Sequence, residues 1–108
     1  MAIRLAAPPR LLRSFPARVL ARATGASVRT TERWRAGQSP QPRYLERLYE
    51  MEAIMEVLGR GMSLQAKRAW LETPNAALGW GRPIDRLAVG DFDAVREAAE
   101  SYVVGDFV

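Results

Sequence analysis

Residues 17–37, ARVLARATGASVRTTERWRAG, can form two short helices but not one long helix, which limits the folds open to this chain. Gly25 is placed to end the first helix, because glycine adopts the positive φ of a helix C-terminus at little steric cost. Ser27 is a good N-cap for the second helix, and Gly37 ends that helix shortly before two prolines. The spacing of these residues predicts a helix-turn-helix.

The second of these helices has two different faces. One face is formed by side chains at every third position, Val28, Thr31 and Trp34, and is predicted to pack on the first helix. We expect Trp34 in the core, where a large aromatic side chain holds the two helices together. The other face is basic, as in a recognition helix that lies in the major groove of DNA. The candidate DNA contacts are Arg29, Thr30, Arg33, Arg35 and Gln38, with Arg35 and Gln38 expected at phosphates.

The charges are unevenly divided along the chain. Its formal net charge is +4, but residues 1–47 hold ten arginines against two glutamates, which gives +8, and the remainder carries −4. Arginine suits bidentate contacts to phosphate and guanine better than lysine does. A basic half beside an acidic half is typical of a nucleic-acid-binding segment joined to one with another partner. The alternative is that genomic composition explains the arginines, although composition alone does not sort charges by half.

The composition excludes several classes of site. Cysteine and histidine are both absent, so the chain has no disulfide framework, no thiolate nucleophile and none of the usual nitrogen and sulfur ligands of zinc. Catalysis would rest on a carboxylate pair such as Asp85 with Asp91 or Asp93, which we interpret as helix caps instead. We therefore expect no enzyme activity, no metal site and no cofactor.

Residues 1–14, MAIRLAAPPRLLRS, begin with a short apolar run that Pro8 and Pro9 interrupt. We expect neither a signal peptide nor a membrane span from this pattern, and hence a cytoplasmic protein. We interpret the segment as an arm that either follows a phosphate backbone or frays, with a short helical piece at Leu11 to Arg13.

Further helices are expected in the rest of the chain, because no segment shows the twofold alternation of a strand. Residues 43–58, RYLERLYEMEAIMEVL, carry apolar side chains on two sides and predict a central helix that packs on both. Ser63 is expected to cap the next helix. One-turn helices are expected to start at Asn75 and Pro83, and the last helix is expected between Asp91 and Gly105, with Phe92, Val95, Ala99 and Tyr102 on one face.

The C-terminal half also carries three motifs in a fixed order. These are W-L-x-x-P-N-x-x-L at residues 70–78, R-P-x-D-x-L at residues 82–87 and G-x-F-V at residues 105–108. Following a helix-turn-helix and a long helix, this order resembles the Xre/MbcA/ParS-type antitoxins of bacterial RES–Xre toxin–antitoxin pairs. The resemblance implies an all-α fold. An Xre-like helix-turn-helix with its long helix would occupy residues 15–58, and a small helical toxin-binding module residues 59–108.

The resemblance also implies a function. The chain would neutralise a cognate RES-domain toxin, an enzyme that consumes NAD or transfers ADP-ribose from it. By position, the residues that would enter or cover the toxin cleft are Gly105, Asp106, Phe107 and Val108. The residues that would shape the module presenting them, and in part touch the toxin, include Trp70, Pro74 and Asn75.

Two further partners follow from the resemblance, since antitoxins of this type dimerise and bind the promoter of their own operon. A homodimer within a larger toxin–antitoxin complex, operator DNA and no membrane are therefore expected. The alternative function is a stand-alone dimeric helix-turn-helix transcriptional regulator. A neighbouring gene for a RES-type protein favours the antitoxin, and its absence favours the regulator.

Overall fold

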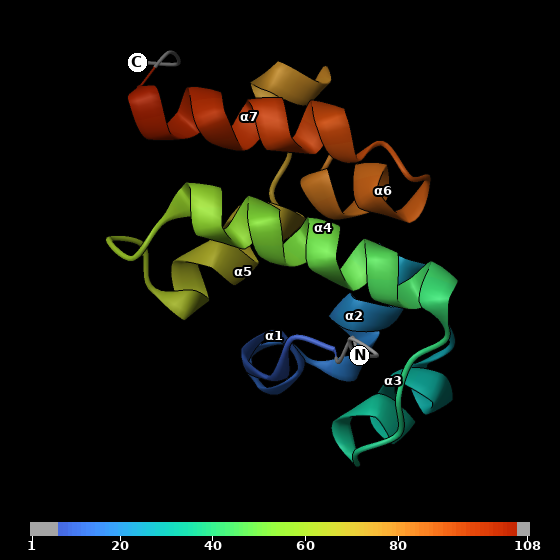
Figure 1. Ribbon diagram of the computed structural model, residues 1–108. Helices are drawn as coiled ribbons and strands as arrows, with labels where there is room; N and C mark the ends of the chain where they lie inside the picture. Colours follow the sequence, from blue (N-terminus) through green and yellow to red (C-terminus); the bar gives the residue numbers. More distant parts are fainter. Residues whose placement is uncertain (1–6, 106–108) are drawn as a thin grey trace, which may run out of the picture.

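The computed structural model describes residues 7–105, and the regular secondary structure of this part is helical (Figure 1). The elements in chain order are α1 (Pro9–Ser14), α2 (Ala17–Thr24), α3 (Val28–Arg35), α4 (Pro42–Leu58), α5 (Leu64–Glu72), the 3-10 helix η1 (Ala76–Leu78), α6 (Pro83–Ala88) and α7 (Phe92–Val104). One isolated antiparallel bridge joins Asn75 to Gly81. The expected all-α fold is confirmed.

Local capping explains where several helices begin and end. Gly25 ends α2 with a φ of +83°. The hydroxyl of Ser27 accepts a hydrogen bond from the N–H of Thr30 at 3.0 Å, and that of Ser63 accepts one from Ala66 at 3.1 Å. These bonds satisfy backbone donors that the first turn of a helix leaves unpaired. The predicted boundaries at these caps are confirmed.

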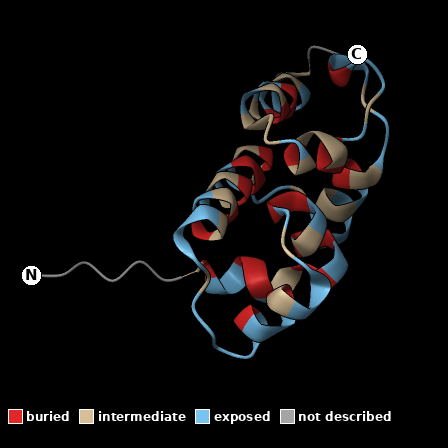
Figure 2. Ribbon diagram, turned by 90° about the vertical axis from the view of Figure 1, so that its right-hand side faces the viewer, coloured by how far each residue is buried: buried red, intermediate tan, exposed pale blue. Residues whose placement is uncertain are grey.

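Helix α4 lies at the centre of the molecule. Its side chains at Leu48, Met51 and Ile54 are fully buried, and they belong to one hydrophobic cluster to which helices from α1 to α7 contribute. Helix α7 packs against α4, and α6 packs against α2. Figure 2 shows the buried residues on the faces that these helices turn towards each other. The predicted central position of this helix is confirmed.

Residues 9–14 confirm the helical piece expected at Leu11 to Arg13 and correct the interpretation of the surrounding segment as an arm. They form helix α1, in which Leu11 and Leu12 are buried, and Phe15 directly after it is buried as well. The guanidinium of Arg68 in α5 donates hydrogen bonds to the carbonyl oxygen of Ser14. The described part of this segment is therefore integral to the core.

Two residues expected to face the core are exposed. Val28 at the start of α3 has 46% of its surface exposed, although Thr31 and Trp34 are buried as predicted. Tyr102 near the end of α7 is 52% exposed, although Val95 and Ala99 on the same helix are buried. In both helices the stripe of apolar residues turns away from the core at one end.

The molecule is elongated and measures 45 × 29 × 23 Å along its principal axes. Helix α3 lies at one end, and α7 with η1 lies at the opposite end, with α4 between them (Figure 1). No helix formed within residues 7–105 has the length and apolar character needed to cross a membrane.

Candidate binding surfaces

The basic face of α3 lies open to solvent at one end of the molecule. Arg29, Arg33, Arg35 and Gln38 are exposed, and none of the three arginines makes an ion pair with another described residue. Thr30 differs from them, because its hydroxyl accepts a hydrogen bond from the Ser27 hydroxyl at 2.9 Å and belongs to the helix cap. The side chains suited to anionic ligands are therefore the arginines, and Thr30 mainly shapes the start of the helix.

Other arginines of the N-terminal half bind acidic residues of the C-terminal half. Arg18 of α2 lies 2.5 Å from Glu72 of α5, and Arg22 of α2 lies 3.1 Å from Asp85 of α6. The hydrogen bond from Arg18 holds the pKa of Glu72 below its ordinary value. These ion pairs hold the two halves of the chain together. The arginines that form them are part of the positive charge of residues 1–47, and they are not free to bind nucleic acid.

The three aspartates interpreted as helix caps all contact arginines, and of the three only Asp91 occupies an N-cap position. Asp85 lies within the first turn of α6, where Arg82 binds it at 2.8 Å. Hydrogen bonds from Arg82, and then from Arg22, hold the pKa of Asp85 below its ordinary value.

Asp91 and Asp93 at the start of α7 also contact arginines. Asp91 occupies the N-cap position of α7 but makes no cap hydrogen bond, and accepts one from Arg86 at 3.3 Å. Asp93 lies 3.2 Å from Arg96. Within residues 7–105 no group of three or more acidic side chains is arranged to hold a metal ion.

The far end of α7 presents apolar side chains to solvent. Tyr102, Val103 and Val104 are exposed, and Gly105 ends the helix with a φ of +78°. Of the predicted tail, Asp106, Phe107 and Val108 lie outside the described residues. The structure therefore places only Gly105 of the four residues expected to enter a toxin.

Trp70 and Asn75 both have structural roles near this end. Trp70 is buried, and its ring meets the edge of Tyr102 with 6.5 Å between the ring centroids. Its Nε1 has no hydrogen-bond partner among the described residues. Asn75 caps η1 by accepting a hydrogen bond from the N–H of Ala77 at 2.9 Å, whereas Pro74 next to it is exposed.

A feature that the sequence analysis missed lies in the turn after η1. Trp80 is 70% exposed and has a φ of +68°, the one positive φ at a residue other than glycine within residues 7–105. A tryptophan between Gly79 and Gly81 is a visible sequence signal. Its exposure could not be predicted from the sequence, because tertiary contacts bury some apolar residues in short turns and leave others exposed.

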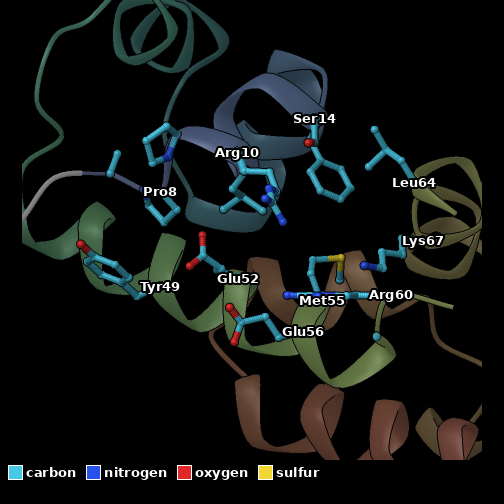
Figure 3. A pocket seen from close by; sticks show the side chains of 15 residues that line it. Pro8, Arg10, Ser14, Tyr49, Glu52, Met55, Glu56, Arg60, Leu64 and Lys67 are labelled. Carbon is cyan, nitrogen blue, oxygen red and sulfur yellow. The ribbon is translucent and has the colours of Figure 1, made fainter. Parts of the chain in front are cut away.

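A cavity of about 870 Å³ opens between α1, α4 and α5 (Figure 3). Glu52 and Glu56 extend into it from α4, and Arg10 lies on the α1 side, with Arg60 and Lys67 towards α5. Burial raises the pKa of Glu52, with a further contribution from the charge of Glu56. This cavity could not be predicted from the sequence, because one of its walls is helix α1, whose position depends on tertiary contacts.

Comparison with known proteins gives a consistent result. Residues 55–98 match the family described as the antitoxin Xre/MbcA/ParS C-terminal toxin-binding domain. The chain is 33% identical over 82 residues to a probable mycobacterial cidal antitoxin of Mycobacterium tuberculosis, covering 76% of this chain and 70% of that relative. It is 30% identical over 84 residues to mycobacterial cidal antitoxin MbcA of Mycobacterium bovis and of Mycobacterium tuberculosis, covering 77% of this chain and 74% of each relative. No solved structure matches the chain significantly.

Proposed function

Because this chain belongs to the family of Xre/MbcA/ParS antitoxins, we propose that it binds and blocks a RES-domain toxin that consumes NAD or transfers ADP-ribose from it. The observation that carries the proposal is the match of residues 55–98 to a toxin-binding domain, together with relatives that are themselves named antitoxins. Their names indicate a non-enzymatic, regulatory role. The RES identity of the partner rests on the order of the sequence motifs.

The C-terminal end is the proposed inhibitory segment. Gly105 ends α7 beside the exposed Tyr102, Val103 and Val104, so a partner docked there meets an apolar helix end followed by the tail. Phe107 can fill an apolar slot in the toxin, and a carboxylate such as Asp106 can pair with basic groups that bind cofactor phosphates. Trp70 packs against Tyr102 and supports this end from within the module, and Asn75 shapes the turn at η1.

Co-expression tests this proposal directly. The neighbouring gene product is expressed with the full chain or with a chain lacking residues 106–108, and growth and NAD content are measured. The full chain is expected to restore growth, and the shortened chain is expected to remain folded by circular dichroism but to lose protection. Arg33→Ala serves as the matched control, because it lies at the other end of the molecule. Unchanged protection by the shortened chain contradicts the role of the tail.

We further propose that α3 binds operator DNA. Arg29, Arg33 and Arg35, which form no ion pair within residues 7–105, support this role, as does the sharp turn at Gly25, which sets α3 against α2. Gln38 lies just beyond α3 and is exposed, so it is a candidate for a phosphate contact.

The DNA proposal is tested by anisotropy titrations of operator DNA over a range of salt concentrations. Arg33→Ala is expected to weaken binding and to lower the salt dependence by about one counterion if it contacts phosphate. If Arg33→Ala loses its preference for the operator sequence while the salt dependence of its DNA affinity stays unchanged, Arg33 contacts a base instead of a phosphate. Equal binding by the variant and the wild type rules out Arg33 as a contact.

A homodimer within the toxin–antitoxin complex completes the proposal. Sedimentation of the purified chain, alone and with the toxin, tests the stoichiometry. A chain that stays monomeric under both conditions contradicts the dimer. In that case the co-expression test alone decides whether the chain binds the toxin.

A further inference from the structure

Trp80 combines an unfavourable backbone conformation with an exposed side chain. Its φ of +68° lies in the left-handed region, where a bulky side chain is a genuine outlier. Conformations of this kind persist only when the surrounding structure imposes them, and they are concentrated at functional sites. The indole is 70% exposed, so the chain gains little burial from it in return. The two other tryptophans, Trp34 and Trp70, are buried.

The backbone around Trp80 is held by a compact set of hydrogen bonds. The N–H of Trp80 donates to the carbonyl of Asn75 at 2.9 Å, and the N–H of Asn75 donates to the carbonyl of Gly81 at 3.0 Å. The N–H of Gly81 donates to the carbonyl of Leu78 at 3.1 Å, and the Leu78 side chain is buried. The turn is thus fixed to the core, and the indole projects from a preorganised base.

The charged groups that follow Trp80 are neutralised within the molecule. Arg82 binds Asp85, and Arg86 binds Asp91 while its guanidinium also donates to the carbonyl of Leu78 at 3.2 Å. The contact that this turn offers a partner is therefore the aromatic ring, and the complementary surface is an apolar slot.

We propose that Trp80 anchors the toxin by inserting its indole into an apolar slot on the toxin surface. The inference rests on the proposed function, because Trp80 lies within the residues that match a toxin-binding domain. Tryptophan is enriched among the residues that dominate interface energies, since it buries a large area. The backbone of the turn is already fixed by hydrogen bonds, so it loses little conformational freedom on binding. Asn75 then acts as a positioning residue for Trp80.

Substitution of Trp80 by glycine separates binding from folding. Glycine adopts a positive φ without strain, so Trp80→Gly is expected to unfold at the same or a higher temperature than the wild type. Its dissociation constant for the purified RES-domain product of the neighbouring gene is expected to rise about 10- to 100-fold. The control is Val28→Ser, an exposed apolar residue at the opposite end of the molecule, which should bind like the wild type. Equal loss in both variants overturns the assignment.

Fluorine NMR detects the contact between Trp80 and the toxin directly, in a chain that still binds. The full chain labelled with 5-fluorotryptophan carries one fluorine at each of its three tryptophans, and the spectrum of Trp80→Gly identifies the Trp80 signal. Unlabelled toxin is expected to shift that signal. If the wild type binds toxin, but this signal stays in place and Trp80→Gly binds equally well, the inference fails and the proposed function stands. If the wild type does not bind at all, the proposed function fails.

Discussion

The guanidinium of Arg22 in α2 lies 3.1 Å from the carboxylate of Asp85 in α6, which joins two residues 63 positions apart in the chain. Arg82 binds the same carboxylate, and Arg18 binds Glu72 in α5. The segment with the helix-turn-helix spacing is thus tied to the segment that matches the toxin-binding domain. Both carboxylates have a lowered pKa because arginine donates hydrogen bonds to them.

These lowered pKa values predict a loss of stability in acid. A carboxyl group whose pKa is lower in the folded than in the unfolded chain stabilises the fold above its unfolded pKa, and this contribution disappears as the pH falls through the folded pKa. We expect the free energy of unfolding in urea to fall between about pH 5 and pH 3. Asp85→Asn is expected to lower stability at pH 7 and to weaken this dependence.

The control for this prediction is Asp93→Asn. The side chain of Asp93 is 85% exposed and, among the described residues, pairs with Arg96 alone, so its loss is expected to have a smaller effect than the loss of Asp85. Glu52 acts in the opposite direction, because its raised pKa makes its ionisation unfavourable to folding. An Asp85→Asn variant with the acid profile of the wild type contradicts a stabilising role of the α2–α6 ion pair.

Helix α1 is expected to contribute substantially to stability. Leu11→Ala removes a buried side chain from the core and should cost about 2–5 kcal/mol of unfolding free energy. Arg13→Ala on the exposed side of the same helix should change it by less than about 0.5 kcal/mol. Thermal and urea unfolding measure both variants. Equal small effects would mean that the segment behaves as an arm in solution.

Trp34 is expected to act through packing. It is buried, and its ring lies 5.5 Å from that of Tyr44 at an interplanar angle of 48°. Trp34→Ala should cost about 3–5 kcal/mol of unfolding free energy. Val28→Ser in the same helix should cost less than about 0.5 kcal/mol, because Val28 is exposed. Calorimetry of the two variants gives the comparison, and similar melting temperatures contradict the assignment of Trp34 to the core.

A side chain at Gly25 is expected to destabilise the fold. Its φ is +83°, and a Cβ there would lie 3.3 Å from Nη1 of Arg47, which donates a hydrogen bond to the carbonyl of Thr24. Gly25→Ala should lower the free energy of unfolding by about 1–2 kcal/mol. Gly61→Ala is the matched control, since its Cβ would meet open space and its φ is not positive. Gly61→Ala should be neutral or stabilising by up to about 1 kcal/mol. Destabilisation by the control alone contradicts this account.

The sequence predicted the helix boundaries well where one residue decides the local geometry. Ser27 and Ser63 can each satisfy a backbone donor without help from the rest of the chain, and Gly25 adopts its φ for local reasons. Residues 43–58 carry enough apolar side chains on two sides to indicate a central helix. These predictions needed no knowledge of tertiary contacts.

The predictions failed where contacts between residues far apart in the chain determine the structure. Helix α1 is short and begins at the second of two prolines, and its leucines are buried by contacts with residues far away in the chain. Val28 was misplaced because each three-residue step falls about 60° short of a full helical turn, so Val28 lies about 120° from Trp34 around the axis. Neither the positive φ of Trp80 nor the exposure of its side chain can be predicted from the sequence. The α2–α6 ion pair likewise depends on the packing of distant helices.

The placement of α3 and α7 at opposite ends of a molecule 45 Å long has a thermodynamic consequence. The ends are separated by several Debye lengths at physiological salt, so charges bound at one end are screened from the other. Under the proposed function, toxin and operator then bind with a coupling free energy near zero within one chain. The toxin affinity of the free chain should equal that of the DNA-bound chain. Any cooperativity on the operator then arises between neighbouring chains.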